Sequence, residues 1–310
     1  MATTTVALVQ AGGMTDDLTG NLATLSELIR AAAAPDATGA TPDLVVLPEL
    51  ITTPYFCAGE GPDRGDWAQP VPGHTTTVFG ALARELGCAL AFGMYERDAD
   101  GTTYNSVVLI DAEGNPVPWQ APGSTLPAYR KLSLPRSPVG DVLIDEKRHF
   151  SPGPAPATVD LGGVRFGCVI CYDRTFPENW AVARALGATV MLAVVSSLGT
   201  REALFLAELQ TRALESQMWV VAVNRAGPET LNGATVDYFG LSCVIAPDGT
   251  IVAQAPAHLT GPILRYSLDL DAVAAARAGL PLGRDRRPDV LRLLADLTAS
   301  ASANTSGQAA

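Results

Sequence analysis

Two kinds of segment are missing from this sequence: long apolar runs and clusters of basic residues. No apolar run is long enough to span a membrane, and the start, MATTTVALVQ, lacks the basic and apolar regions of a secretory signal. The net charge of −11 at pH 7 argues against binding to nucleic acid or to an anionic membrane, because both need clustered lysine and arginine. We therefore expect a cytoplasmic protein that acts on a small molecule.

Cysteine is scarce, and its spacing argues against a disulfide scaffold. The five cysteines form an odd, irregularly spaced set that is typical of free thiols in a reducing compartment: Cys57, Cys88, Cys168, Cys171 and Cys243. Cys168 and Cys171 form a C-x-x-C pair, but no second pair exists and the three histidines lie far away in the sequence. On a strand, residues three apart point to opposite faces. We therefore expect neither a metal site nor a cofactor.

Short apolar, β-branched runs that alternate with helical patterns are abundant. The 310 residues, 47% of them hydrophobic, are enough to bury a large core. The runs predict strands at 5–10, 44–47, 89–95, 106–111, 164–171, 189–195, 219–224, 242–246 and 263–270. Apolar residues at spacings of three and four predict helices at 17–34, 75–86, 177–186 and 202–217. This alternation is typical of an α/β protein with βαβ units.

Parts of the chain depart from this alternation. Pro247-Asp248-Gly249 is a turn signal between two extended runs, so we expect mixed sheets, with antiparallel hairpins, that are covered by helices. Residues 111–156 are rich in proline and glycine and predict a long functional loop. Residues 299–310 are small and polar and predict a disordered tail, which leaves a single domain at 1–298.

The helix predicted at 202–217 is expected to bury one apolar face. We expect that face to lie opposite Glu208 and Arg212 and to carry Leu204, Leu206, Leu209 and Leu214.

Two predicted strands end in residues that suit catalysis. The run LVVLPEL places the ionisable Glu49 directly after a buried strand, and ligands usually bind at the carboxyl ends of strands in α/β proteins. In GCVICYDRTFPENW an apolar strand ends at Cys171, and Pro177 begins a helix. Such an elbow presents a nucleophile beside unpaired backbone N–H groups, which bind an oxyanion. Taken singly, Glu49 also fits a solvated strand end and Cys171 a small buried side chain.

Two further charged residues lie between these strands. Lys131 lies in the proline-bounded segment AYRKLSLP, where burial of an ammonium group requires carboxylate partners. Glu146 lies in IDEKRHFSPG, in the loop that leads to Pro152. Taken singly, either residue also fits an exposed surface position.

The order of these four motifs resembles that of the nitrilase (carbon–nitrogen hydrolase) superfamily. The motifs are PE, YRK, E-K-x-x-F-x-P-G and C-x-D-x-x-F-P-E, and the resemblance extends from Val6 to about Leu297. It implies a four-layer αββα sandwich with two mixed sheets. It also implies that Cys171 is the nucleophile, Glu49 the general base and Lys131 the residue that stabilises the oxyanion. Glu146 matches a second glutamate of structural or catalytic function.

The chemistry of these side chains is consistent with the implied roles. A carboxylate accepts the thiol proton as the sulfur attacks, and an ammonium group, with the backbone N–H of Tyr172, stabilises the oxyanion. A thioester forms, the nitrogen leaves, and Glu49 then activates water. We therefore predict an amide hydrolase that acts on linear, non-peptide C–N bonds.

The segment around Cys171 is similar to that of N-carbamoyl-amino-acid hydrolases and β-ureidopropionases, which also place an arginine three residues after the cysteine. We assign Tyr172, Arg174 and Ser196 to substrate binding, with Arg174 bound to a substrate carboxylate. This favours an N-carbamoyl amino acid, which yields the amino acid, CO2 and ammonia. The alternative for Arg174 is a structural pair with Asp173 or Glu178.

Other outcomes stay open at this point. Thr175 and Ser133 depart from the D-carbamoylase pattern, so an ω-amidase or another aliphatic amide hydrolase is an alternative, as is an acyl or amide transferase in which an amine resolves the thioester. A protein that only binds its ligand would not need all four reactive positions. The resemblance also implies a homodimer or a higher homo-oligomer, formed through residues 176–186.

Overall fold

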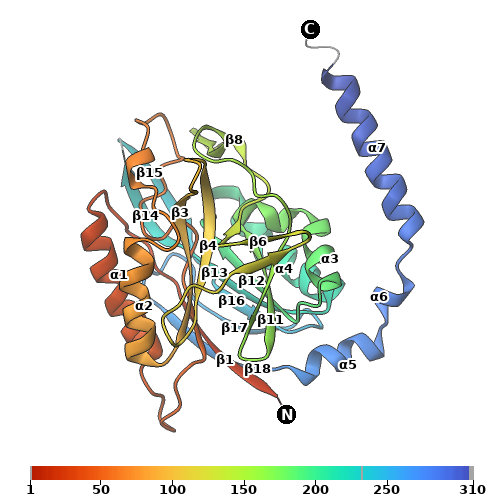
Figure 1. Cartoon of the computed structure of the whole chain (residues 1–310), viewed down its shortest axis with the longest axis horizontal. Helices are drawn as coiled ribbons and strands as arrows, with labels where there is room; N and C mark the ends of the chain where they lie inside the picture. The colour runs from red at the N-terminus through yellow and green to blue at the C-terminus, as the bar shows by residue number, and fades with distance from the viewer. Residues whose placement is uncertain (1, 232, 307–310) are drawn as a thin grey trace. The chain divides into compact units, whose positions relative to one another are not determined.

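The structure is a computed structural model that describes residues 2–231 and 233–306. The chain forms two compact units, Met1–Val273 and Ala274–Ala310. Within the first unit, Figure 1 shows two large sheets that lie next to each other, with helices outside them. No helix of the described residues has both the length and the apolar character that a membrane span requires.

The first sheet has six strands, three of which run parallel at its centre. Its order is β18 (Ile263–Asp269), β1 (Thr3–Val9), β2 (Leu44–Val46), β3 (Ala89–Arg97), β4 (Thr103–Ile110) and β7 (Tyr129–Arg130). Strands β1, β2 and β3 pair in parallel, whereas β18, β4 and β7 pair antiparallel to their neighbours. The mixed pairing agrees with the sequence prediction.

The second sheet has eight strands and a similar parallel centre. Its order is β17 (Ile251–Gln254), β16 (Cys243–Ile245), β13 (Trp219–Asn224), β12 (Val190–Val195), β11 (Val164–Ile170), β10 (Thr158–Leu161), β5 (Trp119–Ala121) and β6 (Ser124–Leu126). Strands β11, β12 and β13 are parallel. The predicted hairpin around Pro247-Asp248-Gly249 is confirmed as the antiparallel pair β16–β17.

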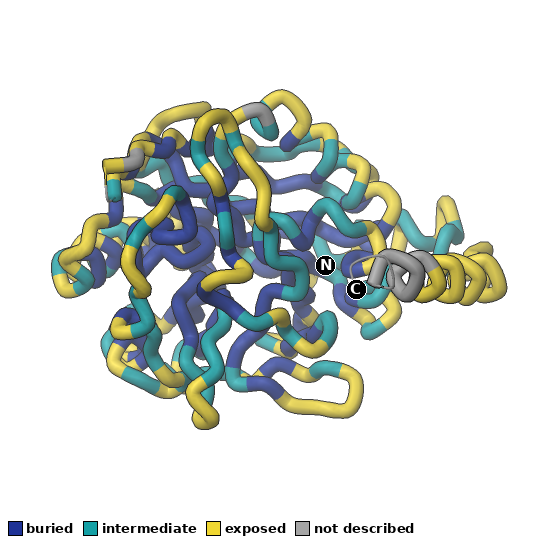
Figure 2. The backbone as a smooth tube through the Cα atoms, turned by 90° about the horizontal axis from the view of Figure 1, so that it is seen from above, coloured by how far each residue is buried: buried dark blue, intermediate teal, exposed yellow. Residues whose placement is uncertain are grey.

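Helices cover the outer face of each sheet. Helices α1 (Leu18–Ala33) and α2 (His74–Leu86) lie on the first sheet, and α3 (Pro177–Ala185) and α4 (Glu202–Ser216) lie on the second (Figure 1). Between the sheets, apolar residues such as Val46 and Leu192 form a shared core. Figure 2 shows that the central strands are buried. The predicted four-layer αββα sandwich is confirmed.

Smaller elements connect these layers. Two hairpins are formed by β8 (Arg136–Val139) with β9 (Val142–Asp145) and by β14 (Ala226–Leu231) with β15 (Ala234–Phe239). The short 3-10 helices are η1 (Gly65–Trp67), η2 (Glu146–Arg148), η3 (Cys171–Thr175) and η4 (Gly199–Arg201). The prediction of one long loop at 111–156 is wrong, because this region holds β5 to β9. These strands have two to four residues each and are too short to show a clear periodicity in sequence.

The predicted buried face of α4 is right for Leu209 but wrong for Leu204 and Leu214. The buried side chains include Phe205, Leu209 and Ala213, whereas Leu204 is 62% and Leu214 46% exposed. Residues four apart on a helix share a face, so Leu204 lies on the same stripe as the polar residue 208 and not opposite it. Phe205 starts the stripe that packs on the second sheet.

The last elements are α5 (Asp271–Gly279), α6 (Leu282–Asp285) and α7 (Pro288–Ser306). Helix α7 includes residues 299–306, where composition predicts disorder, and residues 307–310 lie outside the described residues. The division into a domain at 1–298 and a disordered tail at 299–310 stays a prediction.

Candidate active site

The candidate catalytic residues meet at the carboxyl edge of the two sheets. Glu49 follows β2, Cys171 follows β11 and Ser196 follows β12, and these three strands belong to the parallel centres of the sheets. Lys131 directly follows β7, and Glu146 begins η2. The fold therefore brings to one place residues that are far apart in the sequence.

Lys131 is held between two carboxylates. Its Nζ lies 2.7 Å from Glu49 Oε1 and 2.6 Å from Glu146 Oε1, and all three side chains are fully buried. Two residues that the sequence did not point to complete the cluster. Asn105 Nδ2 donates to Glu49 Oε1 over 2.7 Å, and the Tyr55 hydroxyl donates to Glu146 Oε1 over 2.6 Å. This Lys131 cluster leaves the ammonium group charged and fixed in position.

Burial and mutual repulsion set the charges of the cluster. Burial by itself lowers the pKa of Lys131, but the neighbouring Glu146 and Glu49 outweigh it and hold that pKa well above its usual value. For Glu146, burial raises the pKa to about 7, with a further contribution from the negative Glu49 that the Lys131 charge opposes. Lys131 thus pairs with two carboxyl groups, and one of them, Glu146, titrates near neutrality.

Cys171 lies at a sharp elbow between β11 and α3. Its φ of 45° lies in the left-handed region, which non-glycine residues rarely adopt. The predicted strand–turn–helix elbow is present, with η3 as the turn. Burial raises the pKa of the Cys171 thiol and Glu49 raises it further, while Lys131 and Arg174 oppose the shift. The sulfur is therefore a thiol at neutral pH and needs a base to become a nucleophile.

Glu49 is suited to be that base. Its Oε1 atom is engaged by Lys131 and Asn105, but in the described part of the chain its buried Oε2 atom has no hydrogen-bond partner. A buried carboxylate oxygen without a partner is rare in folded proteins and favours a functional role. It is available to accept the thiol proton.

The turn that carries Glu49 is held by Arg225, which the sequence did not single out for a role. Its guanidinium donates to the Glu49 carbonyl over 3.0 and 3.2 Å and to the Thr53 carbonyl over 2.9 Å. Arg225 is fully buried and pairs with Glu229. Ser196 belongs to the same support, because its hydroxyl donates to the Glu49 carbonyl over 3.0 Å.

Asp173 joins the elbow to the segment that carries Lys131. Its buried carboxylate accepts hydrogen bonds from the backbone N–H groups of Ile170, Leu132 and Ser133, at distances of 2.7 to 3.3 Å. The aspartate of the C-x-D motif thus fixes the distance between the cysteine and the lysine segment. From the sequence, Asp173 was predicted only as a position of the C-x-D motif and as a candidate partner of Arg174.

Arg174 has a partner that the sequence did not suggest. Its Nε lies 3.0 Å from Glu208 Oε2 on α4, and its Nη1 donates to the Cys171 carbonyl over 2.9 Å. The predicted alternative was a structural pair of Arg174 with Asp173 or Glu178. Arg174 does form a structural pair, but its partner is Glu208. Substrate binding by Arg174 stays a prediction.

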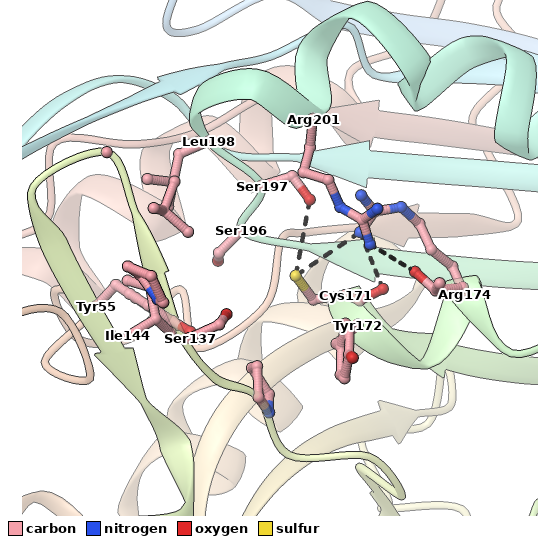
Figure 3. A pocket seen from close by; sticks show the side chains of 15 residues that line it. Tyr55, Ser137, Ile144, Cys171, Tyr172, Arg174, Ser196, Ser197, Leu198 and Arg201 are labelled. Atoms are coloured by element: carbon pink, nitrogen blue, oxygen red, sulfur yellow. Dashed lines mark hydrogen bonds between the residues drawn. The ribbon is translucent and has the colours of Figure 1, made fainter.

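A cavity of about 400 Å3 opens onto Cys171. Figure 3 shows Tyr172, Arg174 and Ser196 among the residues that line it, so all three predicted substrate-binding residues lie at the cavity. Arg201, the last residue of η4, lies there too and was not predicted from the sequence. Cys171 Sγ lies 3.7 Å from the hydroxyl of Ser197, which also lines the cavity.

Among the described residues, no group of three or more His, Cys, Asp or Glu side chains is arranged to hold a metal ion. Cys168 packs in the core between the sheets, and each of the five cysteines is free. The C-x-x-C pair therefore does not form a disulfide in this structure.

Several known proteins resemble this chain in sequence or in fold. The family model described as "Carbon-nitrogen hydrolase" matches residues 5–278. The N-carbamoylputrescine amidase of Solanum lycopersicum is 32% identical over 317 residues, which cover 96% of each chain. A carbon–nitrogen hydrolase structure from Helicobacter pylori has a TM-score of 0.82 and 23% identity, and it covers 94% of this chain and 98% of that chain. A structure from Saccharomyces cerevisiae, of branch 10 of the nitrilase superfamily, has a TM-score of 0.75, 25% identity and coverage of 92% and 97%.

Proposed function

Because the chain belongs to the carbon–nitrogen hydrolase family, we propose that it hydrolyses a linear C–N bond through a thioester on Cys171. Family membership makes it an amidohydrolase. The observation that carries the mechanism is the Lys131 cluster, in which a fully buried ammonium group contacts Glu49 and Glu146 beside the elbow that bears Cys171.

In the first step, Cys171 Sγ attacks the carbonyl carbon and its proton passes to Glu49 Oε2. Negative charge develops on the carbonyl oxygen, and the Lys131 ammonium group stabilises it together with the backbone N–H of Tyr172. The C–N bond then breaks, and Glu49 gives its proton to the leaving nitrogen, which departs as ammonia.

In the second step, water resolves the thioester. Glu49, again ionised, accepts a proton from water as the water oxygen attacks the thioester carbon, and the proton then returns to the departing sulfur. Glu146 keeps Lys131 in position, since it accepts a hydrogen bond from Nζ over 2.6 Å. No step needs a metal or a cofactor, so we expect activity to survive chelation.

The substrate that we propose is an N-carbamoyl amino acid. Ammonia leaves the carbamoyl group first, and hydrolysis of the thioester then gives a carbamic acid, which decomposes to the amino acid and CO2. The relative from Solanum lycopersicum is named for a different N-carbamoyl compound, a carbamoylated amine. Its name therefore supports a carbamoyl group in the substrate but not a carboxylate. An ω-amidase or another aliphatic amide hydrolase is the alternative.

Substitution of Cys171 tests the mechanism. Cys171→Ala and Cys171→Ser are expected to lose roughly 1,000-fold or more of kcat while the protein stays folded, because removal of a nucleophile abolishes the covalent route. Intact mass measurement of the wild type during turnover should show an adduct of the substrate less ammonia. Cys88→Ala is a matched control, because Cys88 is buried before β3, away from the site. Retained activity in either Cys171 variant would refute the mechanism.

A second experiment separates substrates and outcomes. Ammonia release is measured for N-carbamoyl α- and β-amino acids, N-carbamoyl amines and simple amides, with and without an added amine acceptor. A hydrolase releases the same acid or amine product in both cases, whereas a transferase forms a new amide when the acceptor is present.

A further inference from the structure

We infer that Arg201 is the residue that binds the substrate's anionic group, so that this site selects substrates with a carboxylate over neutral or cationic ones. The inference deepens the proposed function and rests on it. It differs from the sequence prediction, which assigned the carboxylate to Arg174.

The cavity has a positive wall and no negative one among its described residues. Arg174 and Arg201 both line it, and none of the lining residues is Asp or Glu. Figure 3 shows both arginine side chains beside Cys171. Their elements also meet, because Arg201 Nη2 donates to the Thr175 hydroxyl over 2.8 Å, one residue after Arg174. A substrate group next to this wall therefore faces positive charge.

The charge of Arg174 is already compensated. Its side chain is only 2% exposed, its Nε lies 3.0 Å from Glu208 Oε2, and its Nη1 donates to the Cys171 carbonyl over 2.9 Å. A guanidinium that is paired with a carboxylate attracts a second carboxylate far less, because the new anion is repelled by the first. Arg174 therefore links the elbow to α4 as a structural residue.

Arg201 differs in each of these respects. Its side chain is only partly buried, and it has no ion pair with any residue that the structure describes. Its hydrogen bond to Thr175 goes to a neutral hydroxyl, which leaves the positive charge uncompensated. The remaining N–H groups of a guanidinium can bind a carboxylate through two parallel hydrogen bonds. Arg201 is thus the uncompensated cation on the wall that the substrate meets.

This arrangement discriminates by charge. A substrate carboxylate gains an ion pair in the cavity, whereas a substrate ammonium group meets a like charge, with no carboxylate among the described residues that line the cavity to accept it. The site should therefore disfavour N-carbamoylputrescine, whose free amine is protonated at neutral pH, although the relative from Solanum lycopersicum is named for that compound.

Three carbamoyl compounds that differ in charge test the inference: N-carbamoyl-β-alanine as the anion, N-propylurea as the neutral compound and N-carbamoylputrescine as the cation. We expect the wild type to prefer the anion. In Arg201→Met, kcat/KM for the anion should fall by roughly 10- to 100-fold, the usual effect of losing a hydrogen-bonded ion pair, while kcat/KM for the neutral urea changes by less than about threefold. Arg201→Lys, which keeps the charge, should retain part of the preference.

Controls separate binding from folding. Arg30→Met removes an arginine whose partner, Glu85, lies on the outer helices, and it should leave all three substrates unchanged. Thermal unfolding shows whether the Arg201 variants are folded. Arg201→Glu, which reverses the charge, should raise the relative rate with N-carbamoylputrescine.

Two results would overturn the inference while leaving the hydrolase function intact. One is a wild type that prefers the neutral or the cationic compound, and the other is an Arg201→Met variant that slows all three substrates equally, as a purely structural role would predict. If the wild type releases ammonia from none of the three and from no simple amide, the proposed function itself fails, and the inference fails with it.

Discussion

Among single residues, Lys131 shows how a fully buried cation is accommodated. Removing an ammonium group from water costs several kcal/mol, and this is offset here by carboxylates 2.7 and 2.6 Å away. With all three groups ionised, the Lys131 cluster carries one excess negative charge. Burial, together with that excess charge, raises the pKa of Glu146 to about 7. Glu146 is therefore the member of the cluster whose charge changes near neutrality.

The titration of Glu146 predicts the pH dependence of the rate. As the pH falls through about 7, Glu146 takes up a proton and loses the negative charge that holds the Lys131 ammonium group in position. We expect kcat/KM to fall with falling pH in an acid limb near neutrality. In Glu146→Gln the residue no longer titrates, so the acid limb should move to lower pH. The value of kcat/KM should also be lower across the whole pH range. Rate measurements from about pH 5 to about pH 9 on both proteins check this, and an unmoved limb would contradict it.

The pair of Arg225 with Glu229 predicts a stability effect. Arg225→Met leaves a buried carboxylate without its partner, so the free energy of unfolding should fall by roughly 3–5 kcal/mol. Arg165→Met is the control, because its pair with Asp160 is exposed and should contribute far less. Urea denaturation measures both changes.

A double variant separates stability from positioning at the same pair. In Arg225→Met with Glu229→Leu no buried charge is left alone, so part of the stability should return. Activity should not return, because the Glu49 carbonyl still lacks its guanidinium donor. Full recovery of kcat in the double variant would show that Arg225 does not position the base.

At the level of elements, two strained turns present the catalytic groups. Cys171 and Leu50, the residue after Glu49, have φ values of 45° and 46°. A non-glycine residue in this region costs on the order of 1–3 kcal/mol, and surrounding contacts must hold it there. Asp173 holds the first turn and Arg225 the second through hydrogen bonds to backbone groups. Buried polar side chains thus hold both turns in place, Asp173 from within η3 itself and Arg225 from the residue after β13.

Strand β3 limits the position of the second turn, which gives a further prediction. A Cβ atom at Gly93 would lie 2.4 Å from the Leu50 nitrogen and 2.5 Å from the Glu49 Cα, and backbone atoms cannot rotate away. Gly93→Ala should therefore displace the base and lower kcat by at least roughly tenfold. Gly279→Ala, where a Cβ meets nothing within 4 Å, should not change kcat. Wild-type kinetics in Gly93→Ala would mean that the turn tolerates displacement.

For the whole molecule, we expect a homodimer, as the resemblance implies. The expected interface at 176–186 has less free apolar surface than the sequence suggests, because Trp180 and Ala183 are buried in the chain's own core. Helix α4 carries two exposed leucines, Leu204 and Leu214. The two helices α3 and α4 together are therefore the candidate interface.

Light scattering tests this prediction. The wild type should have twice the chain mass, and Leu204→Glu should shift it toward the monomer, because a buried unpaired carboxylate is unfavourable at an interface. Leu259→Glu, at another exposed leucine, should not. A monomeric wild type would contradict the dimer without bearing on the chemistry.

Much of the fold could be predicted from the sequence because it depends on local patterns. Each of the nine predicted strands and each of the four predicted helices lies within a few residues of its predicted position, since periodicity is a property of neighbouring residues. The six-residue strands β14 and β15 were not predicted. Strand-end positions also identified Glu49 and Cys171 as candidates. The short strands between 111 and 156 and the buried face of α4 could not be predicted in this way.

The sequence by itself determined the nine predicted strands and four predicted helices, the two strand ends and the order of the four motifs. Only the tertiary structure decided which charges meet: Lys131 with Glu49, 82 positions away, Arg174 with Glu208, and Arg225 with the turn after β2. The physical reason is that an ion pair depends on distances of a few ångströms between side chains, and these are set by how two sheets and their loops pack. That packing leaves Arg201 as the uncompensated cation beside Cys171 among the described residues.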